Sequence, residues 1–205
     1  MLNLYIGGIG SCALASHIAL EEAGADYTVT RLDFKAGQQK SPDYLKVNPK
    51  ARVPALVTDM GTITETPAVL FYIGQMFPKA NLLPHNPFDI ARMQDFNSYL
   101  CSTVHPNHAH AFRGARWSDD PAVIEGLKKK VPQNVAENFA LIQDIYLKGP
   151  YVIGEQFSIA DIYLYTIATW LEGDGVDVNT LPKIKAHRER VGARHAVQKV
   201  RATYA

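Results

Sequence analysis

The segment RVPALVTDMGTITETPAVLFYI (residues 52–73) is the most informative part of the chain about its type of fold. Residues 53–57 and 62–64 are rich in β-branched and aliphatic side chains, and Asp59-Met60-Gly61 separates them, as in two strands joined by a tight turn. From Thr66 to Phe77 apolar side chains recur at helical spacing. We therefore predict a hairpin followed directly by a helix, unlike the crossover helices of a purely parallel sheet.

Upstream of this stretch the chain alternates strands and helices. Residues 2–6 form a short apolar run that a glycine-rich loop interrupts, and residues 11–23 show helical spacing that Gly24 ends. Residues 27–32 alternate as a strand does, and Ser41-Pro42 has the signature of a helix start. The expected order is strand, helix, strand, short helix, two strands, helix.

After residue 78 the character of the sequence changes. Prolines 78, 84 and 87, with Asn and His between them, predict a linker over residues 79–87. Residues 88–205 show helical periodicity almost throughout, with one short strand-like run at 151–153. We therefore expect two domains, an α/β domain over residues 1–78 and an all-α domain over residues 88–205.

The composition excludes several classes of protein. The 205 residues include 21 Lys and Arg against 20 Asp and Glu, and this balance provides no basic field to hold nucleic acid or an anionic membrane. Every apolar run is too short for a membrane span, and the first residues lack the pattern of a secretory signal, so we expect a cytoplasmic protein. Two cysteines, Cys12 and Cys101, provide neither a disulfide framework nor a four-thiolate metal cage.

The glycine-rich loop has two interpretations. Gly8-x-Gly10-x-x-Ala13 lies between a strand and a helix, and Asp33 follows about 20 residues later, as in a dinucleotide-binding fingerprint. The predicted hairpin makes an NAD-binding protein the less favoured alternative. In the other interpretation, Ser11 and Cys12 lie at a helix start, whose N–H groups stabilise the thiolate of Cys12 or of a bound ligand.

Four further residues favour a ligand that is a thiol-containing peptide. Pro54 opens a strand, which predicts an edge position or a cis peptide bond and leaves the N–H and C=O of Val53 free for an extended peptide. Thr66, at a helix start, offers a hydroxyl and backbone amides to a carboxylate, and Glu65 can accept from an ammonium group. Together with the helix start at Cys12, these groups match the chemistry of glutathione.

Four segments carry a resemblance to a known family: SCALASHIALEEAG (11–24), YLKVNPKARVPAL (44–56), TETPAVLFYI (64–73) and FSIADIYL (157–164). They resemble bacterial glutathione S-transferases, closest to the beta class. The resemblance implies a thioredoxin-like N-terminal domain (βαβ–ββα), an all-helical C-terminal domain and a homodimer. It implies a glutathione transferase with glutathione as co-substrate, no metal, and either a small hydrophobic electrophile or a disulfide as the second substrate.

The resemblance also implies roles by position. Cys12 matches the residue that contacts the glutathione sulfur, and Val53 matches the backbone partner of the cysteinyl unit before a cis-proline, here Pro54. Glu65 and Thr66 match the acid and the hydroxyl that hold the γ-glutamyl end.

Other positions depart from the family pattern. The loop IGGIGSC (6–12) is one residue longer, so Ser11 or Tyr5 remains an alternative to Cys12 as the group on the sulfur. Lys35 is the nearest basic residue for the glycyl carboxylate, and Arg52, another candidate for glutathione binding, follows Ala51 where the family generally has glycine.

The histidines complete the set of candidates. His105 matches a histidine of the second domain that lies near the thiol, and we expect no metal site at His105, His108 and His110, because they do not share one helix face. His17 is expected to pack within the first helix, and Ser158-x-x-Asp161 to form a capping box. A ligand-binding or regulatory protein without turnover remains the alternative to an enzyme.

Overall fold

The computed structural model describes residues 1–204 and comprises two compact units. The first runs from Met1 to Pro84 and also includes the chain from Gly192 onward, and the second is His85–Val191. The boundary lies inside the predicted linker. The assignment of all residues after 88 to the helical domain was wrong for the last helix, α9 (His195–Ala202), which clusters with the first unit.

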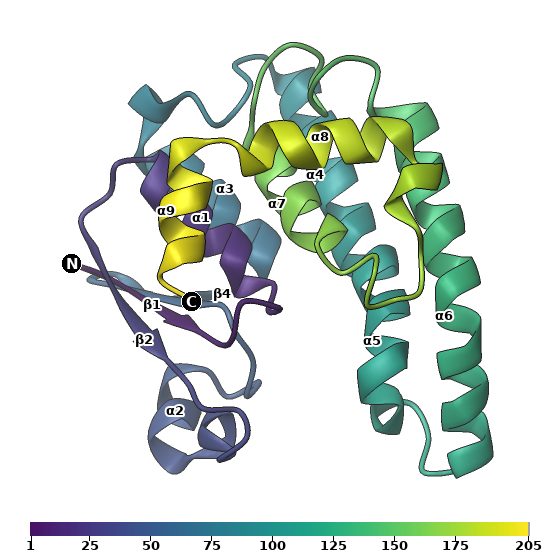
Figure 1. The fold of residues 1–205 in the computed structure, drawn as a ribbon. Helices are drawn as coiled ribbons and strands as arrows, with labels where there is room; N and C mark the ends of the chain where they lie inside the picture. The colour runs from purple at the N-terminus through teal and green to yellow at the C-terminus, as the bar shows by residue number, and fades with distance from the viewer. Residues whose placement is uncertain (205) are drawn as a thin grey trace. The chain divides into compact units, whose positions relative to one another are not determined.

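The first unit is built on a four-stranded mixed sheet of order β2-β1-β3-β4. β1 (Leu2–Ile6) pairs in parallel with β2 (Tyr27–Arg31) and antiparallel with β3 (Ala55–Thr58), which pairs antiparallel with β4 (Gly61–Thr64) (Figure 1). This is the predicted thioredoxin-like arrangement.

The NAD-binding alternative is not supported by this sheet. A dinucleotide-binding domain needs successive parallel strands, whereas the third and fourth strands here run as an antiparallel hairpin. The Asp33 carboxylate accepts instead from the backbone N–H groups of Lys35 and Ala36, at 2.8 and 3.1 Å, and so closes a local turn.

Helices α1 (Ala13–Glu22) and α3 (Thr66–Met76) contact each other, and α9 lies beside α1 (Figure 1). Residues 13–20 are buried all round the first helix, because the sheet, α3 and α9 each cover part of it. The first unit is completed by α2 (Pro42–Val47), η1 (Gln38–Lys40) and η2 (Pro78–Ala80).

Ion pairs hold α9 to α1. The Arg194 guanidinium donates to both carboxylate oxygens of Glu22, at 2.6 and 2.8 Å, and the Lys199 ammonium lies 2.5 Å from Glu21. The apolar side chains Val197 and Val200 are buried beneath these pairs. These contacts explain why the last helix clusters with the first unit.

The second unit is helical, as predicted. Its helices are α4 (Pro87–Tyr99), α5 (His105–Arg113), α6 (Pro121–Leu141), α7 (Ile159–Ala168) and α8 (Pro182–Gly192), with shorter turns η3 (Leu100–Val104), η4 (Gly114–Arg116), η5 (Ile142–Tyr146) and η6 (Val178–Thr180). Every residue of α7 is buried, which makes it the centre of this unit. The strand-like run at residues 151–153 forms only isolated bridges.

The predicted capping box at the start of α7 is present. One Asp161 oxygen accepts from the N–H and hydroxyl of Ser158, at 2.8 and 3.1 Å, and the other from the Val152 N–H and His187 Nε2, at 2.8 and 3.0 Å. Since Asp161 and His187 are fully buried, this carboxylate ties α7 to α8 and to the preceding loop.

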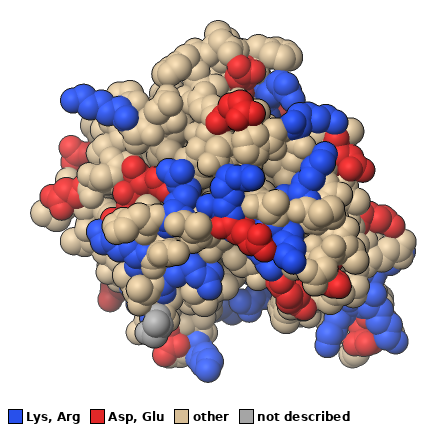
Figure 2. All heavy atoms as spheres, turned by 45° about the horizontal axis from the view of Figure 1, so that its top comes forward, with Lys and Arg blue, Asp and Glu red and all other residues tan. Residues whose placement is uncertain are grey.

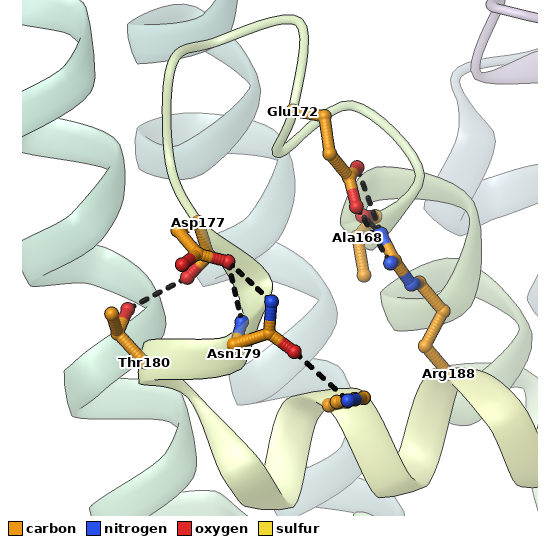
Figure 3. A network of polar contacts seen from close by, with 7 residues as sticks. Ala168, Glu172, Asp177, Asn179, Thr180 and Arg188 are labelled. Carbon is orange, nitrogen blue, oxygen red and sulfur yellow. Dashed lines mark hydrogen bonds and ion pairs between the residues drawn. The ribbon is translucent and has the colours of Figure 1, made fainter.

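The connection between α7 and α8 carries a second polar network (Figure 3). Arg188 donates to both oxygens of Glu172, at 2.9 and 2.6 Å, and to the Ala168 carbonyl at 3.0 Å. Asp177 caps the turn η6 by accepting from the backbone N–H and the side chain of Asn179. These bonds fix the connecting loop at both ends.

Charges of both signs are interspersed on the surface in Figure 2, in keeping with the formal net charge of +1. Among residues 1–204, none of the helices combines the length and the apolar character needed to cross a membrane.

Candidate functional site

Cys12 lies at the start of α1, and two other segments of the first unit meet its thiol. Its Sγ donates a hydrogen bond to the Val53 carbonyl at 3.4 Å, and the Thr66 side chain forms a second hydrogen bond with it. Three segments far apart in the sequence, the starts of α1 and α3 and the loop before β3, therefore converge on one sulfur atom.

The helix start does not bring the pKa of the Cys12 thiol below its ordinary value. Burial raises the pKa of the Cys12 thiol. Hydrogen bonds from Thr66 and from the backbone N–H of Cys12, with the charge of Arg52, only partly oppose this effect, and the Glu65 carboxylate adds to it. Desolvation outweighs these opposing contributions, so Cys12 is a part-buried thiol that donates a hydrogen bond.

Ser11 and Tyr5, the two alternatives, differ in their surroundings. The Ser11 Oγ, beside Cys12, is buried and makes no hydrogen bond to any part of the chain that the structure describes. Tyr5 lies on β1, and its ring packs against Tyr44 with 5.3 Å between centroids. Which of Ser11 and Tyr5 serves as the second group near the sulfur stays a prediction.

The loop before β3 presents a free backbone group. The Val53-Pro54 bond is cis, as one of the two alternatives predicted, whereas β3 is an inner strand. Within residues 1–204 the N–H of Val53 has no hydrogen-bond partner, and its carbonyl accepts only from Cys12. Both groups can therefore pair with an extended peptide.

Buried side chains hold this loop in place. The Arg52 carbonyl accepts from the Tyr44 hydroxyl at 2.5 Å and from the Asn48 side chain at 2.7 Å, and Asn48 is almost fully buried. Ala51, which stands where the resemblance led us to expect glycine, has a φ of 54°, in the left-handed region. The loop is thus fixed from behind, and the Arg52 side chain is exposed.

Glu65 and Thr66 lie at the start of α3. Glu65 precedes the helix with φ 69° and ψ 122°, another left-handed position, and Thr66 is buried against Cys12. The Glu65 carboxylate accepts from the Lys50 ammonium at 2.6 Å, and the same ammonium donates to the Thr64 hydroxyl at 2.8 Å.

Sequence reasoning missed Lys50 and Thr64. The available signal was the position of Lys50, which precedes Val53 by three residues in the segment NPKARVP and so lies close in sequence to the peptide-pairing loop. Lys35 is exposed on the loop after β2, where its backbone N–H binds Asp33.

The predicted histidine lies in the second unit. His105 begins α5, and its ring packs on Trp170 with 5.0 Å between centroids. His108 stacks on the same indole at 4.2 Å, and its Nδ1 lies 2.7 Å from Asp174. A role for His105 at the thiol stays a prediction.

Two remaining predictions concern metal binding and His17. In residues 1–204 no three or more His, Cys, Asp or Glu side chains are grouped so that they could hold a metal ion. The prediction that His17 is a hydrogen-bonded packing residue is confirmed, since its Nδ1 lies 3.3 Å from the Tyr204 hydroxyl and its ring meets that of Tyr27 edge-on.

Comparisons with known proteins agree with this geometry. Residues 2–75 match the family model described as glutathione S-transferase, N-terminal domain, and residues 108–195 match the corresponding C-terminal domain. Glutathione S-transferase GstA of Escherichia coli O157:H7 is 31% identical over 192 residues, which cover 92% of each chain.

Solved structures extend the comparison. A glutathione transferase homologue from Sulfitobacter, with bound glutathione, has a TM-score of 0.96 and 42% identity, and the match covers 99% of this chain and 98% of the other. A beta-class glutathione S-transferase from Sphingomonas chungbukensis has a TM-score of 0.86 and 30% identity, covering 99% and 98%. The chain belongs to the glutathione S-transferase family.

Proposed function

We propose that this protein is a glutathione transferase that binds glutathione on the first unit and uses its thiolate to attack a small hydrophobic electrophile. The observation that carries the proposal is the convergence of Cys12, Val53 and Thr66 on one sulfur atom, beside the carboxylate of Glu65. The family membership supports it, as does the glutathione bound by the Sulfitobacter homologue.

Each part of the tripeptide has a complementary group. The N–H and C=O of Val53 pair with the backbone of the cysteinyl residue. The Thr66 hydroxyl and the first amides of α3 bind the γ-glutamyl carboxylate, and Glu65 binds the α-ammonium group. Lys35 and Arg52 are the candidates for attracting the glycyl carboxylate.

The sulfur of glutathione then lies at the start of α1. The Ser11 hydroxyl, which has no partner in the described chain, and the N–H groups of the first helical turn stabilise a thiolate there. Each pKa unit by which a thiol pKa is lowered corresponds to about 1.4 kcal/mol of such stabilisation. The thiolate attacks the electrophilic carbon, and with an aryl halide the halide ion leaves.

The raised pKa of Cys12 favours conjugation over disulfide exchange. In an exchange reaction the Cys12 thiolate would attack a disulfide sulfur, form a mixed disulfide and release the other thiolate. A thiol with a raised pKa supplies little thiolate at neutral pH, and its reactivity falls accordingly. Conjugation requires no covalent step at Cys12.

A Cys12→Ala variant separates the two chemistries. We expect turnover of glutathione with 1-chloro-2,4-dinitrobenzene to stay within about threefold of the original value, because the substitution removes only the thiol's two weak hydrogen bonds, with Val53 and Thr66, and no reacting group. Cys101→Ala is the matched control, since Cys101 is exposed in the second unit. Loss of conjugation in Cys12→Ala alone would contradict the noncovalent role.

The same assay distinguishes an enzyme from a binding protein, because glutathione binding without turnover would support the ligand-binding alternative. We further propose that the protein is a cytoplasmic homodimer and that side chains of the helical unit, His105 among them, hold the electrophile. Sedimentation equilibrium tests the dimer.

A further inference from the structure

The Lys50–Glu65 ion pair involves the carboxylate that the proposed function assigns to the α-ammonium group of glutathione. The Lys50 Nζ lies 2.6 Å from Glu65 Oε1 and 2.8 Å from Thr64 Oγ1. A primary ammonium group thus already binds the acid, with the same donor chemistry as the amino group of the tripeptide.

The position of Lys50 is fixed by the fold. Its backbone N–H donates to the Asn48 side chain at 3.1 Å, and Asn48 is 1% exposed. The next residue, Ala51, donates its N–H to the Asn48 carbonyl at 3.0 Å and has a left-handed φ. The loop that presents Val53 to a peptide therefore also directs Lys50 toward the start of α3.

The acid is fixed as well. Glu65 is the residue before α3 and has a positive φ of 69°, a backbone conformation that limits where its side chain can reach. The carboxylate is exposed, so a ligand in solution can approach it, and the Lys50 side chain is half exposed, so it can swing away. One carboxylate is thus accessible to two ammonium groups.

We propose that Lys50 competes with the α-ammonium group of glutathione for Glu65 and so determines how strongly the protein selects γ-glutamyl ligands that carry this group. This inference rests on the proposed function. When glutathione binds, its ammonium replaces that of Lys50, and the Glu65 charge stays paired. Because one ion pair replaces another, the ammonium group of glutathione adds to the binding free energy only the difference between two similar ion pairs.

The test compares two S-blocked ligands, S-methylglutathione and its analogue without the α-amino group, S-methyl-N-glutarylcysteinylglycine. Calorimetry gives their dissociation constants, and the ratio of analogue to S-methylglutathione measures the preference for the amino group. An exposed ion pair is worth about 0.2–1 kcal/mol, so Lys50→Met should raise this ratio by about 1.4- to fivefold. Lys50→Arg keeps the competing charge and should leave the ratio unchanged.

Two controls make the result specific. Lys46 on α2 is also exposed and pairs with Asp43 at 2.9 Å, so Lys46→Met removes a nearby charge without touching Glu65 and should not change the ratio. In a Glu65→Gln background, Lys50→Met should also have no effect on the ratio, because the shared acceptor charge is gone.

The inference and the proposed function fail in different ways. If Lys50→Met weakens the binding of both ligands equally, or lowers the ratio of their dissociation constants, Lys50 does not compete for Glu65 and the inference is overturned. If the original protein binds neither S-methylglutathione nor glutathione, the proposed function itself fails.

Discussion

His17 makes the stability of the first unit depend on pH in a predictable way. The side chain is 4% exposed, lies on α1, and is enclosed by Tyr27 and Tyr204. Burial lowers the pKa of His17 from 6.5 to about 4, because the imidazolium would lose its hydration there. Glu21 favours the charged form and Arg31 opposes it, but both are smaller influences than burial.

The number of protons bound by the folded and unfolded chains determines whether stability rises or falls with pH. Between pH 6.5 and pH 4 the unfolded chain carries a proton on His17 and the folded chain does not, so stability rises with pH across this range. The contribution of neutral His17 to the free energy of unfolding is complete above pH 6.5 and is lost as the pH falls toward 4. From the two pKa values the loss is about 2 kcal/mol at pH 5 and about 3 kcal/mol at pH 4.

Urea denaturation from pH 7.5 to pH 4.5 measures this effect when the original protein is compared with His17→Gln. Glutamine still hydrogen-bonds to Tyr204 but does not titrate, and the acidic groups common to both proteins largely cancel in the difference. The original protein should lose about 2 kcal/mol more than the variant between pH 7.5 and pH 5. Parallel pH profiles for the two proteins would refute the assignment.

Three further changes have expected outcomes. Asp161→Asn should lower the free energy of unfolding by about 3 kcal/mol in urea denaturation, because both carboxylate oxygens accept from buried donors and an amide NH₂ must face one set. Ala51→Gly should raise the free energy of unfolding by up to about 1 kcal/mol. A left-handed alanine costs the folded state about 1–2 kcal/mol, and relief of this cost exceeds the conformational entropy that glycine adds to the unfolded chain. Thr66→Val should raise the dissociation constant for glutathione about fivefold, as measured by calorimetry, since it removes one hydroxyl contact.

Each of these changes has its own check. Asp177→Asn is the control for Asp161→Asn, because Asp177 is exposed and a single side-chain oxygen accepts from Asn179, so its effect should stay within about 0.5 kcal/mol. Destabilisation by Ala51→Gly would mean that the left-handed position is not strained. Unchanged affinity in Thr66→Val would remove Thr66 from the glutathione site.

Local sequence patterns predicted most of the first unit, because its elements have clear start and stop signals. Ser41-Pro42 places the start of α2, and the hairpin at residues 53–64 has a clear turn. The last helix was misplaced, because its docking depends on ion pairs such as Arg194–Glu22 between residues 172 positions apart. Helical periodicity carries no information about such a distant partner.

The site was predicted in its residues more fully than in its electrostatics. Cys12, Val53 and Thr66 do meet, but the pKa of the thiol has the opposite shift because burial depends on how the surrounding segments pack. Lys50 was missed for a related reason. A lysine in a loop usually extends into water, and only the folded loop directs this one to Glu65.

The return of α9 to the first unit has a consequence for how the chain is made. Because the segment from Gly192 onward belongs with residues 1–84, the helical unit is an insertion within a discontinuous one. During synthesis from the N-terminus the first unit therefore lacks the residues of α9 that cover α1 until the segment after residue 191 has been translated. A ribosome-bound chain stalled before residue 192 should expose α1 to protease, although every residue of the proposed glutathione site has already been made.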